Sequence, residues 1–258
     1  MHPKSRIWVV PNNDGEAVEI IRLLRSRSEA VLVSHQRWGA SWANLEPAIR
    51  NQLEDANGHR IYGVELAGPN PYSAIDVDHH RYTGDDRSSP QSSLEQVAAI
   101  LGVCLDRWQQ LVAINDRAYF PGLEAAGATP AEIANVRAQD LEAQGLGPED
   151  RLQAETDIAT ASWTGRSAII TCPRGSNSWH GDLLYPHADQ WLLIGPDEWN
   201  YSGPRHLDFA ALALGERTWT GGSPQRGYFG ISQPSPKSQH AIREIFLAHG
   251  ATTRHNSS

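Results

Sequence analysis

Cysteine is scarce in this sequence of 258 residues: Cys104 and Cys172 are its two cysteines, and they lie far apart. Their number and spacing argue against a disulfide scaffold and against a zinc site built from thiolates, and they favour a reducing environment. The sequence also shows no charged and then apolar leader, and no apolar run of membrane-spanning length. We therefore expect a cytoplasmic protein without a membrane partner.

A surplus of basic residues is absent as well. Lysine and arginine together number 22 against 30 aspartates and glutamates, which gives a formal net charge of −8. Binding to long nucleic acid depends on many contacts between basic side chains and phosphates, so we expect no long nucleic-acid partner. A small phosphorylated ligand fits this balance better. The nine tryptophans either pack in the core or stack on a nucleobase, and both interpretations stay open.

The N-terminal part has the pattern of an α/β fold with a parallel sheet. Its short apolar runs are continuous rather than alternating, which is typical of strands that are buried on both faces. Stretches of helical periodicity separate and follow these runs. We expect strands at 6–11, 29–34, 61–66 and 73–78, and helices at 16–26, 43–53, 94–102, 104–115, 130–144 and 148–162.

The composition changes after residue 166. Apolar runs separated by turn residues predict a second set of strands, and a helical pattern closes the chain at 235–250. These strands are expected at 167–173, 181–186, 190–196 and 227–232. The expected fold is a parallel-sheet N-terminal domain with a helical connector, residues 1–162, followed by a smaller α/β domain, residues 163–258.

Acidic and histidine side chains gather where the predicted strands of the first domain end. Ligands of an open α/β sheet bind beyond the carboxyl ends of its strands. Crowded carboxylates repel one another unless protons or cations neutralise them, and mixed oxygen and imidazole ligands suit Mn²⁺ or Mg²⁺. The alternative is a set of separate surface loops whose charges never meet, and spacing alone does not decide between the two. The candidates are Asp14, Glu16, Glu65, Asp78, His79, His80 and Asp116.

The triplet Asp78-His79-His80 follows an apolar strand and resembles the motif that names the DHH phosphoesterases. Residues 92–102, SSLEQVAAILG, resemble the helix that follows the triplet in that family, and residues 113–123, AINDRAYFPGL, resemble its fourth motif. Near the C-terminus, residues 221–230, GGSPQRGYFG, resemble the glycine-rich substrate loop of the companion domain, called DHHA1. The resemblance extends over nearly the whole chain.

The resemblance implies a role for each matching position. His79 would be a metal ligand or a partner of the bridging water, His80 would lie beside the substrate phosphate, and both would be catalytic. The implied metal ligands are Asp14, Glu16, Glu65, Asp78, His79 and Asp116. In the companion domain the implied substrate-binding residues are Gly221, Gly222, Arg226 and Arg205. The active site of such a protein would lie in the cleft between its two domains.

Two positions depart from the family pattern. Val10 stands where the first motif usually has a histidine, and Ser223 or Pro224 stands where the glycine-rich loop usually has one. Because valine binds no metal, one part of the metal site would be weakened.

The function that the resemblance implies is hydrolysis of a phosphoester or phosphoanhydride in a small nucleotide or short oligonucleotide, with one or two Mn²⁺ or Mg²⁺ ions. The alternatives are a non-catalytic nucleotide sensor and an interaction module that kept the fold without metals.

Several other polar residues have a simpler interpretation. Residues 85–87, Asp-Asp-Arg, read as a solvated loop, with an orienting role toward the histidines as the alternative. Asp140 and Glu142 are expected on an exposed helix face. His180 and His187 are isolated in the sequence and are expected to be structural.

Overall fold

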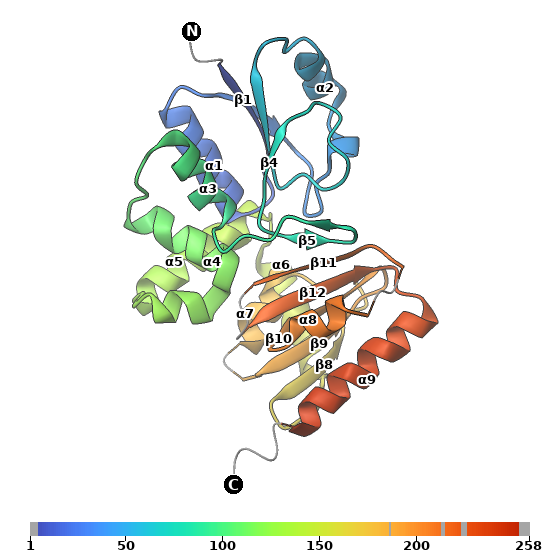
Figure 1. Cartoon of the computed structure of the whole chain (residues 1–258). Helices are drawn as coiled ribbons and strands as arrows, with labels where there is room; N and C mark the ends of the chain where they lie inside the picture. The colour runs from blue at the N-terminus through green and yellow to red at the C-terminus, as the bar shows by residue number, and fades with distance from the viewer. Residues whose placement is uncertain (1–4, 186, 213–214, 223–225, 253–258) are drawn as a thin grey trace. The chain divides into compact units, whose positions relative to one another are not determined.

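The computed structural model describes residues 5–185, 187–212, 215–222 and 226–252. The chain forms two compact units, of which the first comprises Met1–His80 and Arg87–Gly145, and the second Arg81–Asp86 and Leu146–Ser258 (Figure 1). The units therefore divide earlier than the expected boundary at 162/163. Helix α6 (Pro148–Ala159) packs on α7 (Ser178–Leu184), and the segment after the histidine pair joins the second sheet, so both belong to the second unit.

The first unit contains a parallel sheet of four strands in the order β2-β1-β3-β4. Strand β1 lies between β2 and β3, so the chain crosses to opposite sides of β1, and a crevice at such a switch point is where open α/β sheets bind ligands. The strands are β1 (Arg6–Pro11), β2 (Ala30–Ser34), β3 (Arg60–Val64) and β4 (Ile75–Val77). Each of these strands overlaps the range predicted for it.

Helices cover both faces of this sheet, as the continuous apolar runs predict. Trp8 and Val10 of β1 pack into a core with α1, α3 and α4, whereas Val9 points to the other face and packs against Trp42 and α2 (Figure 1). The helices of the unit are α1 (Gly15–Ser26), α2 (Pro47–Glu54), α3 (Ser93–Leu101), α4 (Arg107–Ala125) and α5 (Pro130–Ala143), with a short 3₁₀ turn at Trp42–Asn44.

Helix α4 extends ten residues beyond its predicted end, and it is kinked. Tyr119 has φ 52° and ψ −148°, a backbone conformation outside the helical region, and Pro121 follows inside the helix. Proline has no N–H to donate and clashes with the preceding turn, so it disrupts regular helix geometry. The kink lies three residues after Asp116.

The second unit is built on a mixed sheet of eight strands in the order β6-β5-β11-β12-β10-β9-β8-β7. Neighbours are antiparallel except for β8 and β9, which are parallel. The strands are β5 (Arg81–Tyr82), β6 (Asp85–Asp86), β7 (Ser162–Thr164), β8 (Ser167–Thr171), β9 (Gln190–Ile194), β10 (Glu198–Gly203), β11 (Thr218–Gly222) and β12 (Gly227–Ser232). Helices α8 (His206–Ala210) and α9 (Pro236–Thr252) complete the unit.

One expectation for this unit was wrong, and the strands β5, β6, β7, β10 and β11 were not anticipated. The predicted strand at 181–186 overlaps helix α7, whose start is capped by the Asn177 side chain accepting from the Trp179 N–H. A run of a few apolar residues fits a strand or a helix equally well, so periodicity could not separate them. Strand β10 was missed although its residues alternate between partly buried and buried positions, the pattern of a strand.

No helix among the described residues is both long enough and apolar enough to cross a membrane.

The close packing around Gly63 in β3 leads to a prediction about stability that does not involve the predicted metal ligands. A Cβ atom at this position would lie 2.1 Å from Cζ2 of Trp42, a side chain that is fully buried. We expect Gly63→Ala to lower the free energy of unfolding by about 1–3 kcal/mol, because overpacking a rigid ring forces backbone shifts. Urea unfolding measures this. Gly147→Ala, where the added methyl meets nothing within 4 Å, should cost clearly less; equal costs would contradict the prediction.

Candidate metal centre

The candidate centre begins with Glu65, the residue directly after β3. Its backbone is left-handed with φ 48°, and its N–H donates to the carbonyl of Val77 at 3.0 Å. A non-glycine residue held in such a conformation costs about 1–3 kcal/mol and persists only where its surroundings enforce it. The strain therefore marks Glu65 as a residue whose direction is fixed by the fold.

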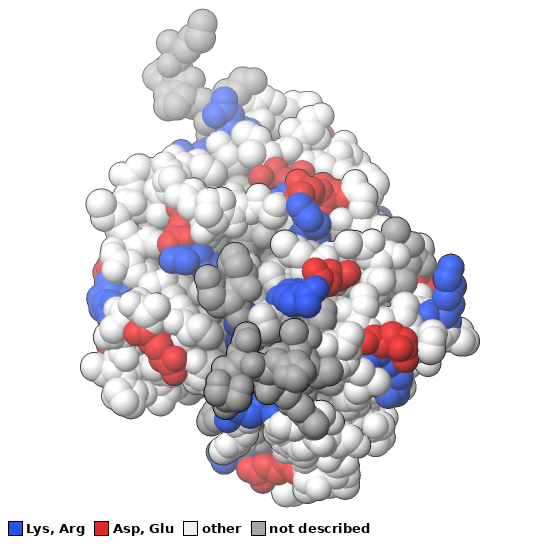
Figure 2. Space-filling model, turned by 60° about the horizontal axis from the view of Figure 1, so that its bottom comes forward, with Lys and Arg blue, Asp and Glu red and all other residues white. Residues whose placement is uncertain are grey.

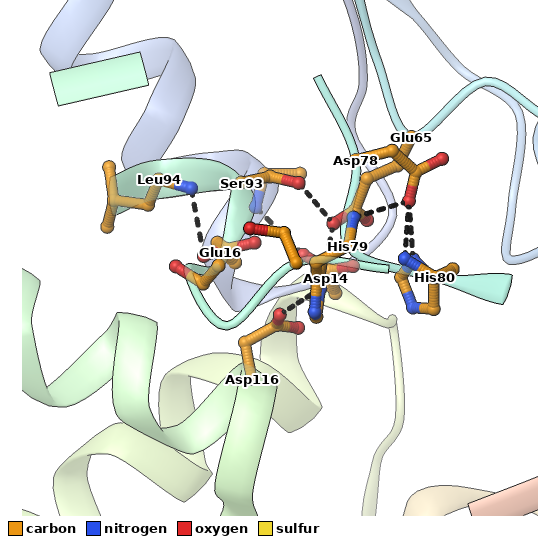
Figure 3. A network of polar contacts seen from close by, with 12 residues as sticks. Asp14, Glu16, Glu65, Asp78, His79, His80, Ser93, Leu94 and Asp116 are labelled. Carbon is orange, nitrogen blue, oxygen red and sulfur yellow. Dashed lines mark hydrogen bonds and ion pairs between the residues drawn. The ribbon is translucent and has the colours of Figure 1, made fainter. Parts of the chain in front are cut away.

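Three side chains from other elements converge on Glu65. Ligand atoms of Glu16, Glu65, His79 and Asp116 all lie within 4.8 Å of one another. His79 Nε2 is 2.7 Å from Asp116 Oδ2 and 3.3 Å from Glu65 Oε1, and Figure 3 shows the carboxylates gathered around this ring. The charges thus meet as the sequence predicts, and the alternative of separate loops is wrong.

The first turn of α3 holds two of these carboxylates. The Ser93 hydroxyl donates to Glu65 Oε1 at 2.8 Å, and the Leu94 N–H donates to Glu16 Oε1 at 3.0 Å (Figure 3). Free N–H groups and the dipole make a helix N-terminus favourable for anions. The helix starts here because Ser92 and Glu95 form a capping box. Residues 92–102 therefore orient the acidic groups.

Asp14 lies at the start of α1, where its Oδ1 accepts from the Ala17 N–H at 2.8 Å. Burial raises the pKa of Asp14 well above its usual value, and the charges of Glu65, Asp116 and Asp140 raise it further. Burial likewise raises the pKa of Glu16 well above its usual value, together with the charges of Asp116 and Glu65. Both carboxyls thus retain protons more strongly than exposed ones do.

The pKa values of His79 and Glu65 are shifted in opposite directions, which favours the charged form of both groups. Burial alone would lower the pKa of His79, but the carboxylates of Asp116 and Glu65 raise it well above its usual value. Burial alone would raise the pKa of Glu65, but the neighbouring His79 imidazole, the charge of His80 and the hydrogen bond from Ser93 lower it to about 2. Without a metal, the cluster is thus balanced by a protonated imidazole beside an ionised Glu65. A bound cation could replace the positive charge of this imidazole beside the carboxylates.

Three buried atoms of the cluster lack a hydrogen-bond partner: Glu16 Oε2, His79 Nε2 and Asp116 Oδ2. The last two are close, but they are not aligned as donor and acceptor. Buried polar atoms are normally satisfied, so these unsatisfied atoms fit a cation, which His79 Nε2 would bind once the imidazole has lost its proton. Carboxylate oxygens with one imidazole nitrogen match the preferences of Mn²⁺ and Mg²⁺. These residues therefore fit the predicted metal.

The second unit offers a contrasting group, Asp157, Cys172 and His180, which is also buried and close-packed. Here His180 Nε2 is hydrogen-bonded to Asp157 at 3.1 Å, Gln153 donates to the other Asp157 oxygen, and burial raises the pKa of the Cys172 thiol to about 12. The imidazole and the carboxylate satisfy each other. This group is explained as structural, as expected for His180.

Asp78 lies just outside the convergent group. Its Oδ1 accepts the N–H groups of His79 and His80 at 2.8 and 2.9 Å, and it is 2.9 Å from the His80 ring Nδ1. Asp78 therefore shapes the turn that presents both imidazoles. His80 is buried and forms an overlapping group with Glu65 and His79. A direct metal bond from Asp78 stays a prediction.

Arg87 was read as part of a solvated loop, and that interpretation is wrong. Its guanidinium donates to the carbonyls of Leu66 and Gly68 at 2.9 and 3.1 Å, and it lies 3.3 Å from Asp76 Oδ1 and 3.7 Å from Asp78 Oδ2. It therefore ties the loop after β3 to the turn after β4. The sequence carried one signal: an arginine beside two aspartates, shortly after the triplet.

Asp140 was expected on an exposed face and is buried instead, with an exposed fraction of 9%. It accepts from the Gly15 N–H at 2.9 Å and pairs with Arg137 at 2.7 Å. Neither Arg137 nor Asn115, which Arg137 contacts, stood out in the sequence. A single acidic residue on a helix gives no signal of burial, because the segment that covers it, here the one around Gly15, is distant in the sequence.

The predicted substrate-binding residues all belong to the second unit. Gly221 and Gly222 end β11, where an added Cβ would meet Tyr228 at 2.5 Å and Gly227 at 2.7 Å. Arg226 donates to the carbonyls of Ala188 and Asp189, and its guanidinium lies over the rings of Tyr185 and Trp191. Arg205 is paired with Asp208 at 2.7 Å. Ser223 and Pro224 lie outside the described residues.

These contacts give Gly221, Gly222 and Arg226 a role within their own unit. The two glycines permit the close approach of β12, and the Arg226 guanidinium is anchored by the two carbonyls. Arg205 is more exposed than these residues, at 60% of its side chain, and its φ is 63°. Binding of substrate by this set stays a prediction.

No protein-family model matches the sequence, and no curated protein matches it. Similar solved structures include a pGpG-specific phosphodiesterase, PggH from Vibrio cholerae, at 10% identity and TM-score 0.43, covering 96% of this chain and 99% of that one. Another is the exonuclease RecJ bound to manganese, at 12% identity and TM-score 0.40, covering 95% and 90%. A third is RecJ with Mg²⁺ from Thermus thermophilus, at 13% identity and TM-score 0.46, covering 96% and 50%.

These structures are similar to the chain over nearly its whole length. The chemistry of the centre rests on this chain's own residues. It is a mixed α/β protein with a candidate site for a divalent cation at the carboxyl ends of its parallel strands.

Proposed function

We propose that this protein is a divalent-metal-dependent phosphoesterase, with Mn²⁺ or Mg²⁺ held by Glu16, Glu65, His79 and Asp116. The observation that carries the proposal is the convergence of ligand atoms from four elements. In this group Glu16 Oε2, His79 Nε2 and Asp116 Oδ2 are buried without a hydrogen-bond partner. Asp14 and Asp78 border this group and complete the proposed ligand set. A bound divalent cation would activate a water molecule and neutralise charge on a phosphoryl group.

The two histidines have distinct roles in this proposal. His79 presents its Nε2 to the carboxylates and serves as the imidazole ligand. His80 is oriented by Asp78, whose Oδ1 lies 2.9 Å from the ring Nδ1. Burial alone would lower the pKa of His80, but Asp78 and Glu65 raise it above its usual value. His80 therefore tends to carry a proton, and it stabilises negative charge that develops on the phosphoryl oxygens.

The substrate class follows from charge. The net charge is −8, and the face drawn in Figure 2 carries basic side chains singly, many of them beside acidic ones. A surface of this kind does not favour the many phosphate contacts of a long polymer. A small nucleotide or short oligonucleotide is the proposed substrate. The second unit, which contains the domain predicted at 163–258, is proposed to bind it.

A non-catalytic nucleotide sensor is the second candidate, and Val10 favours it. This residue is fully buried in the apolar core of the first unit, so its position offers no ligand and no room for one. A site with one ligand fewer binds the cation more weakly. The sensor would bind metal and nucleotide without turnover.

Release of products from a substrate panel tests the proposal. The panel contains pyrophosphate, a dinucleotide, a cyclic dinucleotide and short oligonucleotides, each with Mn²⁺, Mg²⁺ or a chelator. We expect metal-dependent hydrolysis of at least one small substrate and its loss in His79→Ala. Turnover that persists in the chelator, or in His79→Ala, would refute the proposed centre. Binding of Mn²⁺ without turnover of any substrate would favour the sensor, and the absence of both would favour the interaction module.

A further inference from the structure

Helix α5 provides no ligand to the candidate centre, yet it contains a buried ion pair. Arg137 Nη1 lies 2.7 Å from Asp140 Oδ2, and the two residues are 5% and 9% exposed. Taking two charges out of water costs free energy that their attraction often fails to offset, so a buried pair is weak evidence for a contribution to stability. The contacts that the pair makes with other elements indicate a different role.

Asp140 reaches the segment that carries two of the proposed ligands. Its Oδ1 accepts from the N–H of Gly15 at 2.9 Å, and Gly15 lies between Asp14 and Glu16. Gln139 adds a contact from its side-chain amide to the Gly15 carbonyl at 3.3 Å. The approach is close: a Cβ atom on Gly15 would lie 3.0 Å from the Cα of Asp140. The backbone between the two acidic residues is thus fixed by α5.

Arg137 reaches the segment that carries the ligand Asp116. Its Nη1 donates to Asn115 Oδ1 at 3.2 Å, and Asn115 directly precedes Asp116. Its guanidinium carbon lies 4.7 Å from the centroid of the Tyr119 ring, at the kink of α4. Arg137 therefore holds the middle of α4 on both sides of Asp116.

We propose that Arg137 and Asp140 are a positioning pair, which sets the distance between the Asp14–Glu16 segment and Asp116 so that their carboxylates converge on one cation. Each partner anchors one ligand-bearing segment, and the ion pair joins the two anchors. This role rests on the proposed metal centre, but it does not depend on which phosphoester is hydrolysed. It belongs to residues that touch neither metal nor substrate.

The test replaces both charges at once, with the double variant Arg137→Met and Asp140→Leu in the full chain. Apolar side chains of similar size often replace a buried pair without loss of stability, so a melting temperature near that of the wild type is expected. The anchors are lost, and we expect the dissociation constant for Mn²⁺ to rise about 10–100-fold, the effect typical of groups that orient metal ligands. Calorimetric titration of the metal-free protein measures it.

Amide hydrogen exchange of the metal-free protein gives a readout that needs neither metal nor substrate. The Gly15 N–H, which donates to Asp140, should exchange faster in the double variant. Asp140→Asn retains an oxygen acceptor and should restore much of the protection and of the Mn²⁺ affinity. Glu155→Gln, which breaks an exposed ion pair with Arg151 in the second unit, is the control and should change neither quantity.

The outcomes separate this proposal from the proposed function. A stable double variant that binds Mn²⁺ as tightly as the wild type would overturn the positioning role. If the variant does not fold, Asp140→Ala carries the test. It removes the acceptor of the Gly15 N–H together with the ion pair to Arg137, and it should still weaken Mn²⁺ binding. Mn²⁺ binding by a wild type that hydrolyses nothing would overturn the phosphoesterase and leave the positioning role standing. A wild type that binds no Mn²⁺ would overturn both.

Discussion

Replacing Glu16 by glutamine is expected to lower metal-dependent hydrolysis by at least about a hundredfold and, in the opposite direction, to stabilise the metal-free protein. Groups that merely orient ligands change activity 10–100-fold, so loss of a ligand charge should cost no less. Glutamine keeps an oxygen for the Leu94 N–H, which donates to Glu16 at 3.0 Å. The substitution therefore removes charge with little change in shape.

The gain in stability follows from the pKa of Glu16, which burial and the charges of Asp116 and Glu65 raise well above its usual value. A carboxyl whose pKa is higher in the folded state disfavours folding once it must ionise. This cost is absent well below the unfolded pKa of about 4.3 and grows as pH rises above it. The metal-free variant should thus exceed the wild type in stability at pH 8, and the difference should vanish in acid.

Urea unfolding in a chelator at both pH values measures this difference. Glu19→Gln on the same helix is the matched control, because the carboxylate of Glu19 is paired with Arg22 at 3.2 Å and lies outside the cluster. It should bring no comparable gain. A Glu16→Gln protein that hydrolyses normally, or that is less stable than the wild type at pH 8 without metal, would contradict the proposed centre.

Raising the pH is expected to strengthen Mn²⁺ binding by about tenfold per pH unit for each proton that binding releases. In the metal-free protein His79 holds a proton, because Asp116 and Glu65 raise its pKa against the effect of burial. The pKa values of Asp14 and Glu16 are raised as well, burial being the first cause in both. The cation must displace these protons to reach the ligand atoms.

The same shifts set the stability of the metal-free protein. A histidine with a raised pKa contributes stability that is complete below its unfolded value of about 6.5 and is lost as pH rises through its folded value. The metal-free protein should therefore lose stability above neutral pH, and saturating Mn²⁺ should prevent the loss. Calorimetry in two buffers of different protonation enthalpy counts the protons. An affinity that is unchanged between pH 6 and pH 8 would exclude proton release.

The strand ends of the first unit are predictable from sequence, because a parallel sheet combines two readable signals. Continuous apolar runs mark buried strands, and polar residues directly after them must lie at one edge. Glu65 and His79 fall into place by this rule, and both belong to the convergent group. Asp116 comes from a helix instead. It was placed at the end of the predicted helix 104–115, and the motif resemblance then matched it to a metal-binding position.

Long-range support for the ligands is not readable in this way. Arg87 and Asp140 each look like ordinary surface charges, because the backbone groups that they bind lie about twenty residues away for Arg87 and 125 residues away for Asp140. The strain at Glu65 is equally hidden, since no local rule assigns a positive φ to a glutamate. Such features arise only once distant segments are packed together.

The segment Arg81–Asp86 gives the two units an unusual covalent relation. The chain leaves the first unit after His80, forms the hairpin β5–β6, pairs with β11 in the second sheet, and returns at Arg87, whose N–H donates to the carbonyl of His80. Neither unit is a contiguous stretch of sequence. A fragment that ends at residue 145 would carry two strands without their sheet, and one that begins at 146 would expose the edge of β11. Truncation of the chain at this boundary therefore yields no intact unit. An insertion between His80 and Arg87 would perturb the folding of both units.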